Sequence, residues 1–373
     1  MLTVKTKKKT RPKDTLLPHT EILGKIIKPL LIWYRGQSEE RNLPWRSSEN
    51  PYHIWLSEIM LQQTRASAAR LYYERFLSAL PTITALAMAD EDILMKLWQG
   101  LGYYSRARNL KRAAEILVKT NHANLPETFE DLLALPGIGR YTGSAIASIA
   151  FGLPRPAVDG NVLRVVSRIL LSREDILKDA TRRAIERALA PHYPSGKAAG
   201  ELNQAFMDLG AGLCLPHGTP HCADCPLTRL CLAHAEGIET ELPIRKKAKA
   251  RRKEAYTVLR MEFSNAIALR KRPQKGLLAG LWELPNFKGH LTREEIECQL
   301  QNLGIPWKKI EHLSEATHIF SHVEWKMQGW RIVLAEKNST CMVLEDSTGF
   351  IWTTKKELAE RYSIPSAFQY FLY

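Results

Sequence analysis

Four of the six cysteines in this 373-residue chain lie close together, at Cys214, Cys222, Cys225 and Cys231. Their spacing is C-x7-C-x2-C-x5-C, and four thiolates this near one another suit a metal ion or a [4Fe-4S] cluster better than two disulfides. Six cysteines in a chain of this length do not make a disulfide scaffold. Zinc is the main alternative, although zinc ribbons usually present two C-x2-C pairs and this quartet has only one.

A carboxyl group suited to acid catalysis is found at Glu58. At helical spacing its neighbours are Ile54, Trp55 and Leu61, all apolar. Removal of a carboxyl from water raises its pKa, so Glu58 would stay protonated near neutral pH and could donate a proton. The alternative is a solvent-facing glutamate on an amphipathic helix, which the apolar neighbours disfavour.

A second carboxyl group, Asp159, lies twenty residues after a glycine-containing turn, Leu135-Pro136-Gly137-Ile138-Gly139. The turn lies between predicted helices at 129–134 and 140–151. Gly137 and Gly139 permit close backbone approach, and the free N–H groups of the next helix could bind a phosphate. An ordinary helical corner is an equally good interpretation of the pentapeptide alone. Asp159 precedes a further predicted helix, so it could cap that helix, face a developing positive charge, or do both.

The elements that must position these residues fall into two classes. Residues 20–236 have apolar residues at helical spacing and short loops, whereas the C-terminal part alternates as strands do. We therefore predict a multidomain protein, with an all-α domain followed by a smaller α+β domain. The predicted boundaries are a basic tail at 1–20, a helical domain at 21–236, a basic linker at 237–254 and an α+β domain at 255–373. The predicted helices include 93–98, 109–118, 141–151, 162–171 and 292–303, and the predicted strands are 256–262, 266–269, 330–334 and 348–353.

The net charge of +14 is concentrated in two short runs. Residues 5–13 carry +6 and residues 245–253 carry +7, so the rest of the chain is close to neutral. Such runs are typical of solvated segments that attract phosphate chains in a salt-dependent way. No apolar run is long enough to suggest a transmembrane helix. The basic N-terminus lacks the apolar core of a secretory signal.

The hairpin, Asp159 and the cysteine quartet together resemble the helix-hairpin-helix DNA glycosylases that carry an iron–sulfur cluster. Four longer segments narrow the resemblance to the MutY-type adenine DNA glycosylase family, and the likeness runs from about residue 25 to the end. One departure is the interval between Cys214 and Cys222, where the family usually has six residues and this chain has seven, which would fit as a one-residue bulge. The segments are LPWR at 43–46, PYHIWLSEIMLQQT at 51–64, GLGYY at 100–104 and VDGNV at 158–162.

This resemblance implies removal of adenine mispaired with 8-oxoguanine or guanine. Glu58 would protonate the base, and Asp159 would stabilise the sugar cation. Tyr141 stands where endonuclease III-like relatives have a Schiff-base lysine, so the resemblance implies a monofunctional enzyme that leaves an abasic site. Two alternatives remain: an endonuclease III-like lyase, and a non-catalytic iron–sulfur protein that binds DNA or transfers electrons.

The resemblance also implies a set of DNA contacts. Gln63, Thr64, Leu101 and Tyr103 would approach the base opposite the adenine, although Tyr103 could equally be a core aromatic. The flipped adenine would meet Gln204 and Arg46. The other residues implied to contact DNA are Gly137, Gly139 and Asn161.

The C-terminal domain resembles a Nudix fold without its catalytic motif. Gly289 and Glu295 fit the pattern G-x5-E-x7-R-E-x2-E-E, but Leu303 and Gly304 occupy the next required positions. In the family this domain recognises 8-oxoguanine, which implies contacts from Ser321 and His322; an ordinary strand-end turn is the alternative.

The resemblance further implies a [4Fe-4S] cluster on the four cysteines and double-stranded DNA as the partner. We expect a monomer that has no membrane contact. A cytoplasmic, nucleoid-associated protein of a bacterium is expected, or a nuclear protein if the source is eukaryotic.

Overall fold

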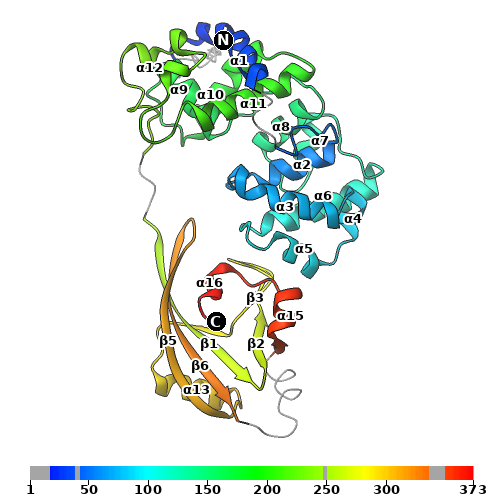
Figure 1. The fold of residues 1–373 in the computed structure, drawn as a ribbon, viewed down its shortest axis with the longest axis vertical. Coiled ribbons are helices and arrows are strands. Elements are labelled where there is room, and N and C mark those ends of the chain that lie inside the picture. The colour runs from blue at the N-terminus through cyan, green and yellow to red at the C-terminus, as the bar shows by residue number, and fades with distance from the viewer. Residues whose placement is uncertain (1–16, 38–42, 247–249, 336–348, 373) are drawn as a thin grey trace, which may run out of the picture. The chain divides into compact units, whose positions relative to one another are not determined.

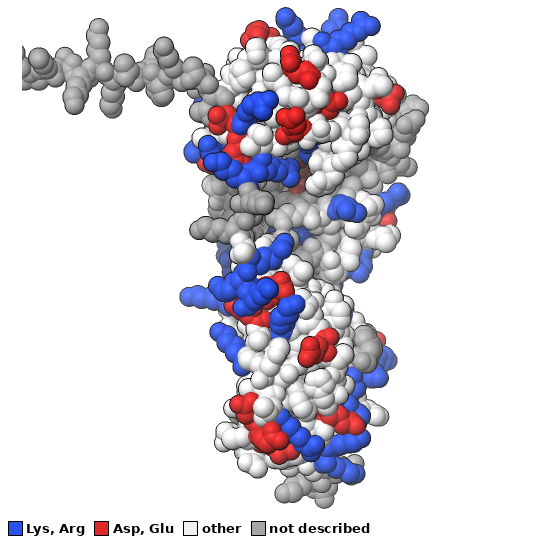
Figure 2. Space-filling model, turned by 90° about the vertical axis from the view of Figure 1, so that its left-hand side faces the viewer, with Lys and Arg blue, Asp and Glu red and all other residues white. Residues whose placement is uncertain are grey.

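The computed structural model describes residues 17–37, 43–246, 250–335 and 349–372. Its contacts divide the chain into two compact units, residues 1–66 with 116–247 and residues 67–115 with 248–373. The basic run at 5–13, part of the run at 245–253 and Cys341 lie outside the described residues. Among the described residues, no helix has the length and apolar character needed to cross a membrane. Basic and acidic side chains are interspersed on the face displayed in Figure 2.

The first unit is helical, as the periodicity of the sequence predicts (Figure 1). The predicted helices are confirmed, with ends that differ by up to four residues; the largest difference is at α6 (Ser105–Thr120), which begins four residues before the predicted 109. Helix α6 runs across the boundary between the units. The helices of the first unit are α1 (Leu23–Gln37), α2 (Pro51–Met60), α7 (Phe129–Ala134), α8 (Arg140–Ile149), α9 (Gly160–Ile169), α10 (Asp179–Leu189), α11 (Lys197–Gly212) and α12 (Leu232–Ala235), with 3-10 turns at Thr20–Ile22, Ala190–His192, Cys222–Asp224 and Thr228–Leu230.

Helix α11 is the centre of this unit, because it packs against α1, α8 and α9. The apolar face of α9, which includes Val162, Val166 and Ile169, is buried in the same cluster as Leu202 and Phe206 of α11. Burial of each such side chain contributes about 1.5–3 kcal/mol, so this cluster holds the helices at fixed distances. Helix α2 packs on α8. Side chains on α2, α8, α9 and α11 can therefore meet.

The described residues of the second unit combine helices with a mixed sheet. The strand order is β3-β2-β1-β6-β5, with β4 paired to β1 and β7 paired to β2. Strands β1 and β6 are parallel, and the other pairs are antiparallel. The helices are α3 (Ala66–Ala79), α4 (Ile83–Met88), α5 (Glu91–Trp98), α13 (Arg293–Asn302), α15 (Lys355–Glu360) and α16 (Ser366–Gln369), and the strands are β1 (Arg252–Phe263), β2 (Ala266–Lys271), β3 (Trp282–Glu283), β4 (Asn286–Lys288), β5 (Trp307–Ile319), β6 (Val323–Leu334) and β7 (Phe350–Thr354).

Alternation along β1 explains why this sheet has two cores. Val258 faces one cluster, with Trp325 and Phe368, whereas Leu259 faces another, with Ile296 of α13. Successive strand residues point to opposite faces, so the two faces of the sheet are covered by different helices, α15 and α16 on one and α13 on the other. The predicted α+β domain is confirmed. The predicted strand at 348–353 is observed from Phe350, and residue 348 lies outside the described residues.

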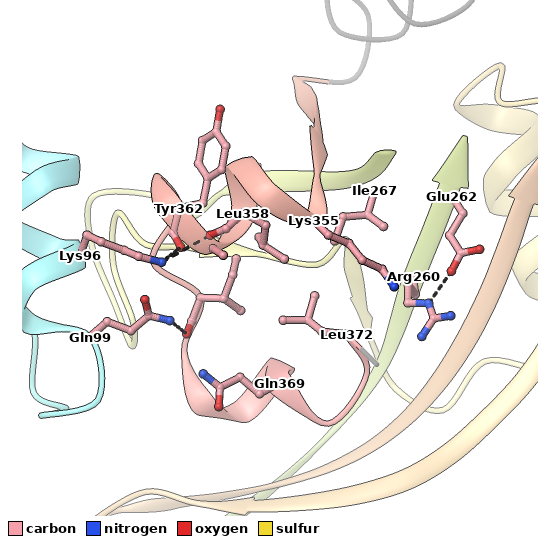
Figure 3. Close-up of a pocket in the computed structure, with 12 residues that line it drawn as sticks. Lys96, Gln99, Arg260, Glu262, Ile267, Lys355, Leu358, Tyr362, Gln369 and Leu372 are labelled. Atoms are coloured by element: carbon pink, nitrogen blue, oxygen red, sulfur yellow. Dashed lines mark hydrogen bonds and ion pairs between the residues drawn. The ribbon is translucent and has the colours of Figure 1, made fainter. Parts of the chain in front are cut away.

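Helix α5 contacts the C-terminal segment through backbone carbonyls (Figure 3). The Nζ of Lys96 donates to the carbonyl oxygens of Leu358 and Tyr362, at 3.4 and 3.2 Å. Gln99 donates to the carbonyl oxygen of Ile364 at 3.3 Å. A cavity of about 160 Å³ lies beside these contacts. Because burial lowers the pKa of Lys96 while its amine satisfies two carbonyls, we interpret this as a packing contact within the unit.

Candidate active site

Glu58 lies in the last turn of α2, which begins at an N-cap. The side chain of Asn50 accepts from the backbone N–H of Tyr52, and Pro51 occupies the first helical position. This start places Glu58 on the inner face of the helix, where it is 5% exposed. Burial raises the pKa of Glu58 to about 7; a hydrogen bond from Tyr141 opposes the rise, and nearby Asp159 adds to it. The predicted burial of Glu58 is confirmed, and its role stays a prediction.

Tyr141 lies in the first turn of α8, directly after the glycine-containing turn. Its hydroxyl donates to Oε2 of Glu58 at 3.2 Å. Burial raises the pKa of Tyr141 well above its ordinary value, so the phenol remains a donor. In the turn, Gly137 has a φ of 82°, which favours glycine, whereas Gly139 has a φ of −89°. The turn and the start of α8 thus place the hydroxyl of Tyr141 within hydrogen-bonding distance of Glu58.

Asp159 is the N-cap of α9, so the structural use considered from the sequence is confirmed. One carboxylate oxygen accepts from the backbone N–H of Val162 at 2.8 Å, and the other accepts from Nδ2 of Asn161 at 2.9 Å. Burial raises the pKa of Asp159, and these hydrogen bonds oppose the rise. Asp159 also acts electrostatically on Glu58 and Tyr141. The three predicted catalytic residues therefore share one buried region.

A chain of hydrogen bonds connects Asp159 with the cysteine loop. Asn161 accepts from Nη2 of Arg164 at 2.8 Å, and Nε of Arg164 donates to the backbone oxygen of Cys214 at 2.8 Å. Close packing of α11 on α9 makes this possible, since a Cβ on Gly210 would lie 2.5 Å from the Cβ of Asn161. Arg164 was not identified from the sequence, where it is one arginine within an apolar helix.

The four cysteines are half-buried and close enough to act on one another electrostatically. Burial raises the pKa of Cys225 to about 11, and the charges of the other three cysteines add to the rise. The guanidinium of Arg168 donates to Sγ of Cys214 at 3.1 Å. Thiols that disfavour each other's ionisation in this way need a cation before all four can be thiolates. The donor set therefore fits a metal centre.

The extra residue between Cys214 and Cys222 is accommodated in a closed turn. The backbone N–H of His221 donates to the carbonyl oxygen of Leu213 at 2.9 Å, which brings the two ends of the segment together. Gly218 lies within it at a φ of 73°. The additional residue thus lengthens the loop without separating the cysteines that flank it.

One face of α11 carries a row of polar residues that contact α1 and the segment before α2. Asp208 binds Arg46 through two hydrogen bonds of 2.5 Å. Gln204, one turn earlier, accepts from the hydroxyl of Tyr34. Arg46 in turn opposes the rise in the pKa of Glu58, so this row lies near the catalytic carboxyl. Asp208 and Tyr34 were missed from the sequence, although the spacing of 201, 204 and 208 on one helical face was a signal.

The other predicted DNA-contacting residues of the first unit follow α2. Gln63 has a φ of 59°, and the backbone N–H of Thr64 donates to the carbonyl oxygen of Leu61 at 3.3 Å. The preceding Gln62 donates to Thr142 of α8 at 3.0 Å. These contacts fix the turn at the end of α2.

The remaining predicted residues lie in the second unit, around a cavity of about 720 Å³. Tyr103 is 46% exposed with a φ of 46°, so its interpretation as a core aromatic was wrong; Leu101 is 7% exposed and lies inside. The hydroxyl groups of Tyr103 and Ser321 are hydrogen-bonded at 2.5 Å. Ser321 and His322 form the turn between β5 and β6, closed by a bond from the N–H of Phe320 to the oxygen of Val323 at 2.8 Å.

Comparisons with known proteins match two successive parts of the chain to two families. Residues 56–191 match the HhH-GPD superfamily base excision DNA repair proteins, and residues 255–373 match the NUDIX domain. The adenine DNA glycosylase of Rattus norvegicus is 32% identical, over 91% of this chain and 76% of the relative. That of Buchnera aphidicola subsp. Baizongia pistaciae is 34% identical, over 79% and 82%. The structure of a thermostable thymine-DNA glycosylase is similar, with a TM-score of 0.51 and 25% identity, over 58% of this chain and 98% of the other.

Proposed function

Since this chain belongs to the adenine DNA glycosylases of base-excision repair, we propose that it removes undamaged adenine paired with 8-oxoguanine or guanine and leaves an abasic site. The observation that carries this proposal is the buried contact between Tyr141 and Glu58 in the neighbourhood of Asp159. The enzyme acts as a monomer on double-stranded DNA, at the bacterial nucleoid or, in a eukaryote, in the nucleus.

The two carboxyl groups divide the chemistry between them. Adenine lies inside the duplex, so it is first rotated out of the stack. Glu58, with a pKa of about 7, is protonated in a large fraction of molecules at neutral pH and donates its proton to N7 of the base. The bond from C1′ to the base then breaks, while the anionic Asp159 faces the positive charge on the sugar. Water adds at C1′, and Tyr141 stabilises the ionised Glu58 through its hydroxyl.

The hydroxyl at position 141 makes the enzyme monofunctional. A lyase needs an amine that forms a Schiff base with the sugar, and the phenol of Tyr141 cannot form one. Its donation to Glu58 gives Tyr141 a task in the glycosylase reaction instead. An endonuclease III-like lyase is therefore disfavoured. A non-catalytic DNA-binding protein would need no buried carboxyl group in contact with Tyr141.

We also propose that Cys214, Cys222, Cys225 and Cys231 hold a [4Fe-4S] cluster. When bound, the cluster supplies covalent bonds that tie residues 214–231 into a rigid loop. Arg168 offsets the negative charge on the first cysteine through its contact with Sγ. Arg164 connects the loop to Asp159 through Asn161, so the order of the loop supports the position of the catalytic carboxylate.

Iron and acid-labile sulfide in the purified protein are expected at four of each per chain. Cys225→Ser should lose most of both, because it removes one of the four ligands. Cys298→Ser is the matched control, since Cys298 is exposed and lies on α13. Stoichiometric zinc without sulfide would contradict the cluster proposal.

The C-terminal domain determines which base the enzyme accepts opposite the adenine. Tyr103, Ser321 and the cavity beside them form a surface that could contact 8-oxoguanine, together with His322. The proposed function is tested by single-turnover excision of adenine opposite 8-oxoguanine, guanine and cytosine. We expect the fastest excision opposite 8-oxoguanine and slower excision opposite guanine. Equal rates opposite all three bases would contradict recognition of the lesion.

A further inference from the structure

The amide of Gln204 is held in one orientation by a residue on another helix. Its Oε1 accepts from the hydroxyl of Tyr34 on α1, which is 170 positions away in the sequence. This is the one hydrogen bond of that amide among the described residues. Burial raises the pKa of Tyr34 above its ordinary value, so the phenol stays protonated and donates. The oxygen end of the amide is therefore occupied, and its amino end remains for a ligand.

Tyr34 also contacts the second residue that we assign to the flipped base. The guanidinium of Arg46 lies over the Tyr34 ring, 5.9 Å from its centroid. The same guanidinium also donates the two hydrogen bonds to Asp208. Tyr34 thus touches both Arg46 and Gln204, and each of them is fixed before a base arrives.

We propose that Tyr34 is a specificity-determining positioning residue, which turns the amino group of Gln204 toward the ring nitrogen N1 of the flipped adenine. The inference rests on the proposed function and adds to it the atom by which the base is read. N1 of adenine is a hydrogen-bond acceptor, whereas N1 of guanine and of hypoxanthine carries a hydrogen. A donor fixed toward N1 therefore accepts adenine and opposes the other two purines.

The energetic basis is the cost of two donors that face each other in a buried site. An unsatisfied buried donor loses its hydrogen bond to water without a replacement, which lowers binding by about tenfold or more. If the hydroxyl of Tyr34 is removed, the amide can rotate and present its oxygen, which accepts from the N1–H of hypoxanthine. The loss of one hydroxyl on α1 should therefore relax the choice of base.

The experiment compares Tyr34→Phe with the wild type on duplexes that carry adenine or hypoxanthine opposite 8-oxoguanine. Single-turnover rates at saturating enzyme give the ratio of adenine to hypoxanthine excision. We expect this ratio to fall about tenfold in the variant. Because each base serves as its own reference between the two proteins, differences in leaving-group chemistry cancel. Tyr73→Phe, which removes a buried phenolic hydroxyl on α3, should keep the wild-type ratio.

A second variant shows whether Tyr34 acts through Gln204. Gln204→Leu should lower the ratio by itself, and Tyr34→Phe should then lower it no further in the double variant. If Tyr34→Phe does not fold, Gln204→Leu alone still tests whether the amide of Gln204 recognises N1 of adenine. Equal losses of both rates, with the ratio unchanged, would overturn the inference and leave Tyr34 a structural residue. A wild-type protein that releases no adenine would instead overturn the proposed function.

Discussion

Replacement of Glu58 by glutamine is expected to lower the single-turnover rate of adenine excision by about 10²–10⁴-fold, the usual contribution of a positioned proton donor. Glutamine preserves the shape of the side chain and its contact with the hydroxyl of Tyr141. Its amide is not acidic, however, so it cannot transfer a proton to the base. Binding of the mismatched duplex should be retained, because the substitution removes no positive charge and no contact with the DNA backbone. The measurements are excision at saturating enzyme and equilibrium binding of the same duplex.

The pH dependence separates loss of a proton donor from general damage. Excision by the wild type should fall as the pH rises above about 7, where Glu58 ionises, and the residual activity of Glu58→Gln should lack this fall. The pKa of Glu58 is raised in the folded protein above its ordinary 4.5, so protonation favours folding. That stability is present below pH 4.5 and is lost as the pH rises through about 7. The neutral glutamine should thus be no less stable at pH 8. Wild-type activity in Glu58→Gln would refute the assignment.

Replacement of Asp159 by asparagine is expected to lower excision by about 10²–10³-fold. The carboxylate faces the positive charge that develops on the sugar, and a neutral amide removes this attraction. Asparagine caps a helix about as well as aspartate, so the bond to the backbone N–H of Val162 can persist and α9 should remain intact. The rate is measured on the A:8-oxoguanine duplex, and folding is followed by thermal unfolding.

Asp90→Asn is the matched control for this substitution. Asp90 is also an N-cap, whose side chain accepts from the N–H groups of Asp92 and Ile93 at the start of α5. The same chemical change there should alter stability by a similar amount and leave excision unchanged. If both variants lose the same activity, helix capping explains the effect and the electrostatic role of Asp159 is wrong.

The parts of the site that were predictable are those set by local spacing. The apolar neighbours of Glu58 predicted that its side chain is buried. The position of Asp159 before a helix predicted that it caps the N-terminus of that helix. The four cysteines were visible because they are close in sequence. The helical domain and the α+β domain followed from the periods of their apolar residues, which depend on each element alone.

The parts that were missed depend on pairs that are distant in sequence. Asp208 and Arg46 are 162 positions apart, and Tyr34 and Gln204 are 170 apart. Their meeting depends on how α11 packs against α1 and against the segment before α2, which the period of a single helix does not reveal. Tyr103 was ambiguous for a related reason. A Leu-Gly-Tyr sequence does not say which side chain points inward until the left-handed backbone at Tyr103 is known.

Release of adenine without strand cleavage is tested most directly by one single-turnover reaction on a duplex with a single A:8-oxoguanine pair. Free adenine and cleaved strand are quantified from the same samples, with and without alkali. We predict one equivalent of adenine per duplex, with strand cleavage at that site only after alkali. Cleavage without alkali would identify a lyase, and tight binding with no adenine released would contradict the enzymatic role of Glu58 and Asp159.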